Sequence, residues 1–214
     1  MAADLSDIAA ALQAGRTAQT RAAVEAALEA GFSPLEVLSG GLIPGMDEVG
    51  RRFSAAEIFL PEVLVAARAM HAGMAVLRPR LAASGIPPQG RIVLGTVQGD
   101  LHDIGKNLVG TMLEGAGFEV VDLGTDVGAD RFIDAALEQD APLIGMSALL
   151  TTTMTGMAEV VGRIKERGLH GRLRTIIGGA PVRAEWARSI GADGWAANAP
   201  GAVAEVRRLL ARPG

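Results

Sequence analysis

From residue 91 onward, short β-branched segments alternate with stretches that have the spacing of helices. Five of these segments are predicted to be strands, at residues 91–97, 119–124, 143–147, 174–178 and 194–197. Regular alternation of strands and helices is typical of parallel sheets, because each right-handed crossover lays a helix on one face of the sheet. The pattern therefore predicts the α/β fold class, with a flavodoxin-like or Rossmann-like five-stranded parallel sheet.

The first 85 residues follow a different pattern, in which apolar residues recur at helical spacing. Ser33, Pro34 and Glu36 have the order of a capping box with proline in the first turn. Between residues 63 and 81 the apolar positions alternate steps of four and three, the seam of a packed bundle. We therefore expect a four-helix bundle cap domain over residues 1–85.

Two prolines and two glycines interrupt the periodic pattern between residues 82 and 90. We expect a linker at 86–90, acting as a hinge, and an α/β domain over 91–214.

Composition limits the classes of partner. The formal net charge of -4 disfavours a nucleic-acid surface. The chain has no cysteine, which excludes disulfides, thiolate zinc sites and cysteine nucleophiles. No apolar run is expected to reach the roughly 20 residues of a membrane span, and the N-terminus lacks the features of a signal peptide. We expect a soluble, cytoplasmic protein with no membrane or nucleic-acid partner.

His102 follows the first predicted strand, at the edge where parallel sheets bind ligands. Asp100 can accept a hydrogen bond from one imidazole nitrogen, which makes the other nitrogen a stronger metal donor. Gly99 and Gly105 leave room for a bulky ligand, and the helix after Gly105 offers free amide groups. His102 is therefore a candidate metal ligand.

The rest of the chain lacks the partners of a protein-built metal site. Such a zinc site needs three or four ligands, and no HExxH-type cluster is present. His71 and His170 are interpreted as ordinary bundle and turn residues. A lone histidine suffices when the metal arrives in a macrocycle, as in haem or a corrin. Because this half has few aromatic residues for a haem pocket, cobalt in a corrin fits better.

Three ordered motifs connect the chain to a known family. They are DxHxxG at residues 100–105, SxL at 147–149 and a glycine pair at 178–179, each near a predicted strand end. With them the chain resembles the cobalamin-binding module of methionine synthase and, more closely, the stand-alone corrinoid proteins of methyltransferase systems.

The resemblance implies a cofactor and a way of binding it. Cobalamin, as methylcobalamin or a related corrinoid, would bind base-off, with its benzimidazole tail in a slot of the α/β domain. His102 would replace that tail below the cobalt, and Asp100 would hold His102 and share its proton. The residues expected to bind the cofactor in this domain are Gly99, Asp100, Leu101, His102, Asp103, Gly105, Ser147, Leu149, Thr151, Gly178, Gly179 and Ala199.

Several of these residues also have an ordinary structural interpretation. Asp100 could be a helix N-cap, and Leu149 could belong to the core. Ser147 is expected to hydrogen-bond in the tail slot or to the Asp–His pair, and Thr151 is expected to make another polar contact. Loop chemistry alone would also explain both hydroxyls.

The helical half resembles the cap of the same family. By that resemblance Phe53, Leu60 and Val63 would cover the methyl-bearing face of the corrin and keep it dry. Residue type alone would place them equally well in the bundle core.

No residue set is expected to activate a methyl donor or acceptor, so the chain is expected to be a carrier that is not catalytic alone. The resemblance implies a methyl carrier between a substrate-specific corrinoid methyltransferase and an acceptor methyltransferase, with a reductive activase as a further partner. Two alternatives stay open. One is a cobalamin-dependent sensor, which would usually carry an output domain; the other is the cobalamin subunit of a split methionine synthase or a mutase.

Overall fold

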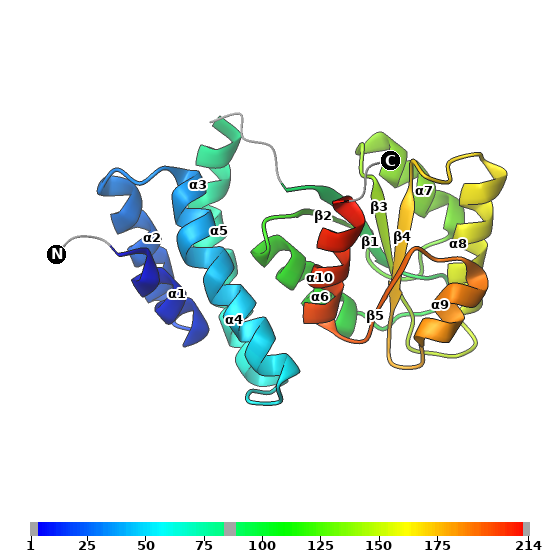
Figure 1. The fold of residues 1–214 in the computed structure, drawn as a ribbon, viewed down its shortest axis with the longest axis horizontal. Helices are drawn as coiled ribbons and strands as arrows, with labels where there is room; N and C mark the ends of the chain where they lie inside the picture. Colours follow the sequence, from blue (N-terminus) through cyan, green and yellow to red (C-terminus); the bar gives the residue numbers. More distant parts are fainter. Residues whose placement is uncertain (1–3, 84–88, 212–214) are drawn as a thin grey trace. The chain divides into compact units, whose positions relative to one another are not determined.

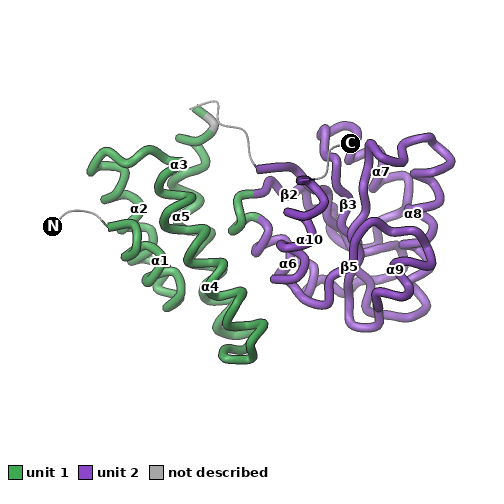
Figure 2. Tube along the Cα trace, viewed as in Figure 1, with its two compact units in different colours: residues 1–88, 114–117 green, residues 89–113, 118–214 purple. Residues whose placement is uncertain are grey.

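The computed structural model describes residues 4–83 and 89–211. It divides into two compact units, residues 1–88 with 114–117 and residues 89–113 with 118–214 (Figure 2). Most of the linker expected at 86–90, and with it the predicted hinge, lies outside the described residues.

The regular elements of residues 4–83 are all helices (Figure 1). They are α1 (Leu5–Gln13), α2 (Thr17–Glu29), α3 (Pro34–Val37), η1 (Leu38–Leu42), α4 (Ile43–Ser54) and α5 (Leu60–Ala83). The expected capping box is present, because the Ser33 hydroxyl accepts from the Glu36 N–H and the Glu36 carboxylate accepts from the Ser33 N–H. The helical bundle expected for this half is confirmed.

One turn of this unit was not predicted. The segment η1 is a π-helix that continues directly from α3 into α4. The following helix lies close to α1, since a Cβ atom at Gly45 would be 3.0 Å from the Ala9 Cα. The glycine at this position permits the close approach of the two backbones.

The helix α5 corrects one expectation from the sequence. Residues Leu60–Leu81 form a 22-residue stretch with a hydropathy of 1.3, long and apolar enough to cross a membrane. However, Val63, Met70 and Leu77 of this helix are almost completely buried, and α5 packs along α2. Core helices of bundles have this same character, so the stretch is weak evidence for a membrane span.

The second unit contains a five-stranded parallel sheet with the order β2-β1-β3-β4-β5. The strands are β1 (Arg91–Thr96), β2 (Glu119–Asp122), β3 (Leu143–Ser147), β4 (Arg174–Gly178) and β5 (Gly194–Ala196). All of them begin at the residues predicted from the sequence, and β1, β2 and β5 end one or two residues earlier. The predicted α/β fold class is confirmed.

Helices cover both faces of the sheet (Figure 1). They are α6 (Ile104–Gly115), α7 (Ala129–Glu138), α8 (Thr155–Glu166), α9 (Ala184–Ile190) and α10 (Ala199–Leu210). Helices α7, α8 and α9 lie on one face, around a core that includes Phe132 and Ile144, and α6 and α10 lie on the other. Since the chain leaves β1 and β3 toward opposite sides, their carboxyl ends form the position where open α/β sheets bind ligands.

A tight backbone contact joins the loops that follow β3 and β4. Gly179 has a φ of +130°, and a Cβ atom there would lie 1.9 Å from the carbonyl oxygen of Ala148. Only glycine fits this position without moving one of the two loops.

We expect Gly179→Ala to lower the free energy of unfolding by about 3 kcal/mol or more, because the methyl group overlaps backbone and the φ is unfavourable. The matched control is Gly162→Ala in α8, where a Cβ atom would meet nothing within 4 Å. This control should raise the free energy of unfolding by up to about 1 kcal/mol through helix propensity. Urea denaturation followed by circular dichroism measures both, and equal midpoints for the two variants would contradict the assignment.

Candidate functional site

The loop after β1 holds a completely buried carboxylate, that of Asp100. Its Oδ1 accepts hydrogen bonds from the backbone N–H of His102 at 3.1 Å and from the His102 Nδ1 at 2.7 Å. Its Oδ2 accepts from the backbone N–H groups of Leu149 at 2.8 Å and Leu150 at 3.2 Å, and from the Thr153 hydroxyl at 2.7 Å. Donors from the loops after β1 and β3 therefore meet on one carboxylate.

These bonds decide the charge of Asp100. Burial would raise the pKa of this carboxyl, but the hydrogen bonds from Leu149, Thr153 and His102 outweigh burial and hold the pKa well below its usual value. Asp100 is therefore a carboxylate at neutral pH. A carboxylate bonded to Nδ1 keeps the proton on that nitrogen and leaves the lone pair on Nε2.

The backbone of His102 is fixed from the sheet. The hydroxyl of Thr96, the last residue of β1, donates to the His102 carbonyl oxygen at 2.9 Å, and Thr96 itself is fully buried. The imidazole, in contrast, is half exposed, with 50% of the side chain open to solvent. Among the described residues, the hydrogen bond that the ring makes is the one from Nδ1, so Nε2 is available to a ligand.

Exposed apolar side chains lie on the same two loops and at the start of α6. Leu101 is 73% exposed and Ile104 69%, and Leu149 and Leu150 are each 43% exposed. Large apolar side chains rarely gather on a surface that contacts only water, and such patches mark binding sites. A single nitrogen donor thus stands among side chains suited to a large apolar ligand.

The donor set fits a metal that is already chelated. In the part of the chain that the structure describes, no three His, Cys, Asp or Glu residues gather closely enough to hold a metal ion. His102 can supply one ligand, and a tetrapyrrole-type macrocycle supplies its own equatorial nitrogens. The exposed leucines and isoleucine would contact the flat apolar face of such a ring.

Comparison with known proteins shows what this site belongs to. Residues 90–206 match the B12 binding domain model, and residues 5–78 match a second model of the same description. The chain is a member of the B12-binding corrinoid proteins. Its cofactor is a cobalamin or related corrinoid.

The relatives match over most of their length. Dimethylamine corrinoid protein 2 of Methanosarcina mazei is 48% identical over 190 residues, 88% of this chain and 88% of the relative. A cobalamin-binding protein from Desulfitobacterium hafniense has a TM-score of 0.80 and 33% identity, over 98% of this chain and 99% of that one. A chain of the methanol:cobalamin methyltransferase complex MtaBC from Methanosarcina barkeri has a TM-score of 0.84 and 31% identity, over 98% of this chain and 80% of that one.

The structure brings most of the predicted site residues to one edge of the sheet. The loop after β1 carries the predicted residues from Gly99 to Asp103, Gly105 lies in the first turn of α6, and the loop after β3 carries Leu149. Gly178 ends β4 in register with Ser147, and Gly179 lies against the β3 loop. Ala199 is buried at the first position of α10, after β5.

One hydroxyl differs from the expectation. The side chain that bonds Asp100 is Thr153, whereas Ser147 is half buried at the end of β3 and Thr151 is exposed. The run of threonines from 151 to 153 contained this residue, but which of them faces Asp100 depends on the turn before α8. Sequence reasoning also missed Thr96, because a threonine in a strand has no distinctive signal. The expected contact of Ser147 with the cofactor tail stays a prediction.

The remaining predicted residues belong to the helical unit. Phe53 and Leu60 are half buried, and Val63 is buried in the core of that unit. Phe59, which the sequence did not single out, is 66% exposed. The role of Phe53, Leu60 and Val63 as an apolar cover stays a prediction.

The lowered pKa of Asp100 predicts how stability depends on pH. A carboxylate with a depressed folded pKa contributes fully above its unfolded pKa of about 3.9, and the contribution is lost as the pH falls below that value. Asp100→Asn should lower the free energy of unfolding of the apoprotein at pH 7 by about 2–4 kcal/mol, since an amide N–H₂ would face N–H donors. The difference from wild type should shrink below about pH 4.

Urea denaturation at pH 7, 5 and 3.5 measures this effect. The control is Asp140→Asn, a substitution at an exposed turn after α7, which should match the wild type throughout. A difference between Asp100→Asn and wild type that stays constant with pH would count against a charged Asp100.

Proposed function

We propose that this chain is the methyl-carrying corrinoid subunit of a methyltransferase system, with His102 as the lower axial ligand of a base-off corrinoid. One observation carries the proposal. Asp100 accepts from Nδ1 of His102 at 2.7 Å, on a ring that is half exposed, so that Nε2 is left as the donor. A histidine held in this way is a strong and well-oriented metal ligand.

The residues of the chain orient and tune this ligand. Cobalt in the bound corrinoid supplies the centre that accepts a methyl group and gives it up. Asp100 holds the proton of Nδ1 and raises the donor strength of Nε2. Thr96 fixes the His102 carbonyl, and Thr153 fixes Asp100 from the β3 side. The imidazole therefore needs little reorganisation when it binds.

We propose that the nucleotide tail of the corrinoid enters between the ends of β3, β4 and β5. Small residues gather there, namely Ser147, Gly178, Gly179 and Ala199. A long tail needs a channel that side chains do not fill, and the two glycines bring no side chain to this edge of the sheet.

The partners follow from the relatives. Corrinoid proteins that are named for dimethylamine, and a methanol:cobalamin methyltransferase complex, are similar to this chain over most of its length. We therefore propose a methylamine or methanol methyltransferase as the donor-side partner, an acceptor methyltransferase, a reductive activase and a cytoplasmic location. Because the similar relatives carry the names of corrinoid proteins of dimethylamine, a carrier is favoured over a sensor or a mutase subunit.

The test is direct observation of the axial nitrogen. Protein loaded with hydroxocobalamin and reduced to Co(II) should show electron paramagnetic resonance splitting from one axial nitrogen. That splitting should change when the protein is made with ¹⁵N-histidine. His102→Ala should lose it and bind the corrinoid at least about tenfold more weakly.

His170→Ala is the matched control, because His170 is exposed and follows α8 at the other end of the sheet. It should keep the histidine splitting of the wild type. Retention of that splitting in His102→Ala, with circular dichroism unchanged, would contradict the assignment of the ligand.

A further inference from the structure

Asp126, in the loop between β2 and α7, has an unusual backbone conformation. Its φ is +57°, in the left-handed region that residues other than glycine adopt at a cost. Aspartate is tolerated there better than most residues, because its short side chain can hydrogen-bond locally. The side chain of Asp126 is exposed, so burial does not explain its presence.

The bonds of Asp126 reach across to the loop that carries His102. Its Oδ1 accepts from the backbone N–H of Gly99 at 2.7 Å, and its own N–H donates to the carbonyl oxygen of Asp100 at 3.1 Å. Gly99 is itself left-handed, with a φ of +80°. One residue thus holds Gly99 and Asp100 by two bonds of opposite direction.

The segment that carries Asp126 is anchored to β1. The Val127 N–H donates to the Thr96 carbonyl oxygen at 3.0 Å, and the Thr96 N–H donates to the Gly124 carbonyl oxygen at 2.9 Å. Val127 also forms a parallel bridge with Val97. The backbone that carries Asp126 is therefore itself hydrogen-bonded to the central strand β1.

A second contact holds the start of α6, the helix that follows the loop with His102. The ammonium of Lys106, in the first turns of α6, is buried and lies 2.6 Å and 2.7 Å from the two oxygens of Asp122. Asp122 and Asp126 therefore hold the His102 loop on the β2 side, at residues 99–100 and at residue 106. The Asp100 carboxylate, by contrast, is held from the β3 side.

From these contacts we propose that Asp126 is a positioning residue for the axial ligand. By holding the backbone of residues 99 and 100, it aims the Asp100 side chain at its donors on the β3 loop, and Asp100 in turn aims His102. The inference rests on the proposed function for the role of His102, and it extends that role to a residue outside the three motifs. An ordinary turn residue would need only the left-handed φ, which glycine supplies freely.

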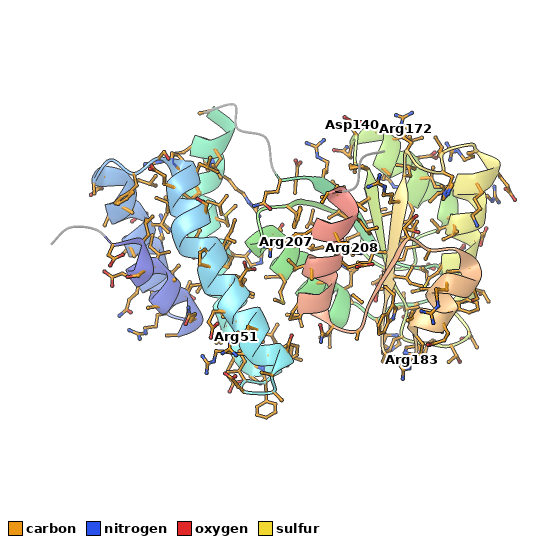
Figure 3. All side chains as sticks on the ribbon, viewed as in Figure 1. Arg51, Asp140, Arg172, Arg183, Arg207 and Arg208 are labelled. Carbon is orange, nitrogen blue, oxygen red and sulfur yellow. The ribbon has the colours of Figure 1, made fainter. Side chains whose placement is uncertain are left out.

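That distinction defines the experiment. Asp126→Gly removes the acceptor while relieving the backbone, and Asp126→Asn keeps both an acceptor oxygen and a tolerance for the left-handed φ. The matched control is Asp140→Gly, the same replacement at another left-handed aspartate, with a φ of +48°. Figure 3 shows Asp140 and Arg172 at the edge opposite Arg183, which follows β4, and Asp140 precedes β3, so it lies away from the loop that carries His102.

Three measurements are made on each full-length variant. Amide hydrogen exchange of the apoprotein reports the Gly99 and Leu149 N–H groups, titration with hydroxocobalamin gives the Kd, and thermal unfolding gives the Tm. In Asp126→Gly we expect exchange at Gly99 and Leu149 to be about tenfold faster and the Kd to rise about fivefold to tenfold, with the Tm kept. Asp126→Asn and Asp140→Gly should behave as the wild type at both amides and in the Kd.

The outcomes separate this inference from the proposed function. Wild-type exchange at Leu149 and a wild-type Kd in Asp126→Gly would overturn the positioning role. If the wild type itself lacks the histidine splitting, the proposed function fails. The positioning of Asp100 is then decided by the amide exchange alone, where faster exchange at Leu149 supports it and unchanged exchange overturns it.

Discussion

The buried carboxylate of Asp100 is the interaction on which the carboxyl edge of the sheet depends. A single buried anion would be unstable, and it is stable here because five hydrogen-bond donors converge on it. Two donors belong to His102 and three to the turn between β3 and α8. The Asp100 carboxylate therefore connects the loops after β1 and β3, and it also selects the tautomer of the His102 imidazole.

Much of this architecture could be predicted from local sequence. Strand starts were predictable because β-branched runs follow turn residues, and the capping box at Ser33 was predictable because its chemistry lies within four residues. The pairing of His102 with Asp100 could also be predicted, since the two residues are two positions apart. Their pairing needs no knowledge of the fold.

What could not be predicted depends on distance along the chain. Thr153 is separated from Asp100 by 53 positions. It is one of three successive threonines, and the sequence does not show which of them bonds Asp100. Asp126 resembles any loop aspartate until its φ and its bond to Gly99 are seen. No apolar run of membrane-span length was expected, yet Leu60–Leu81 is one. Its burial against the other helices, which composition does not reveal, identifies it as a core helix of the bundle.

The pairing of β1 with β3 has a consequence for the order in which the fold and the site form. Three of the five donors for Asp100 come from a segment that lies about fifty residues later in the chain, and they reach it only after these two strands have paired. Before that, the aspartate is hydrated and the imidazole is free to take either tautomer. A chain that has not completed its central sheet therefore lacks three of the five hydrogen bonds that fix the Asp100 carboxylate, and the orientation of His102 depends on a pairing made far from it in the sequence.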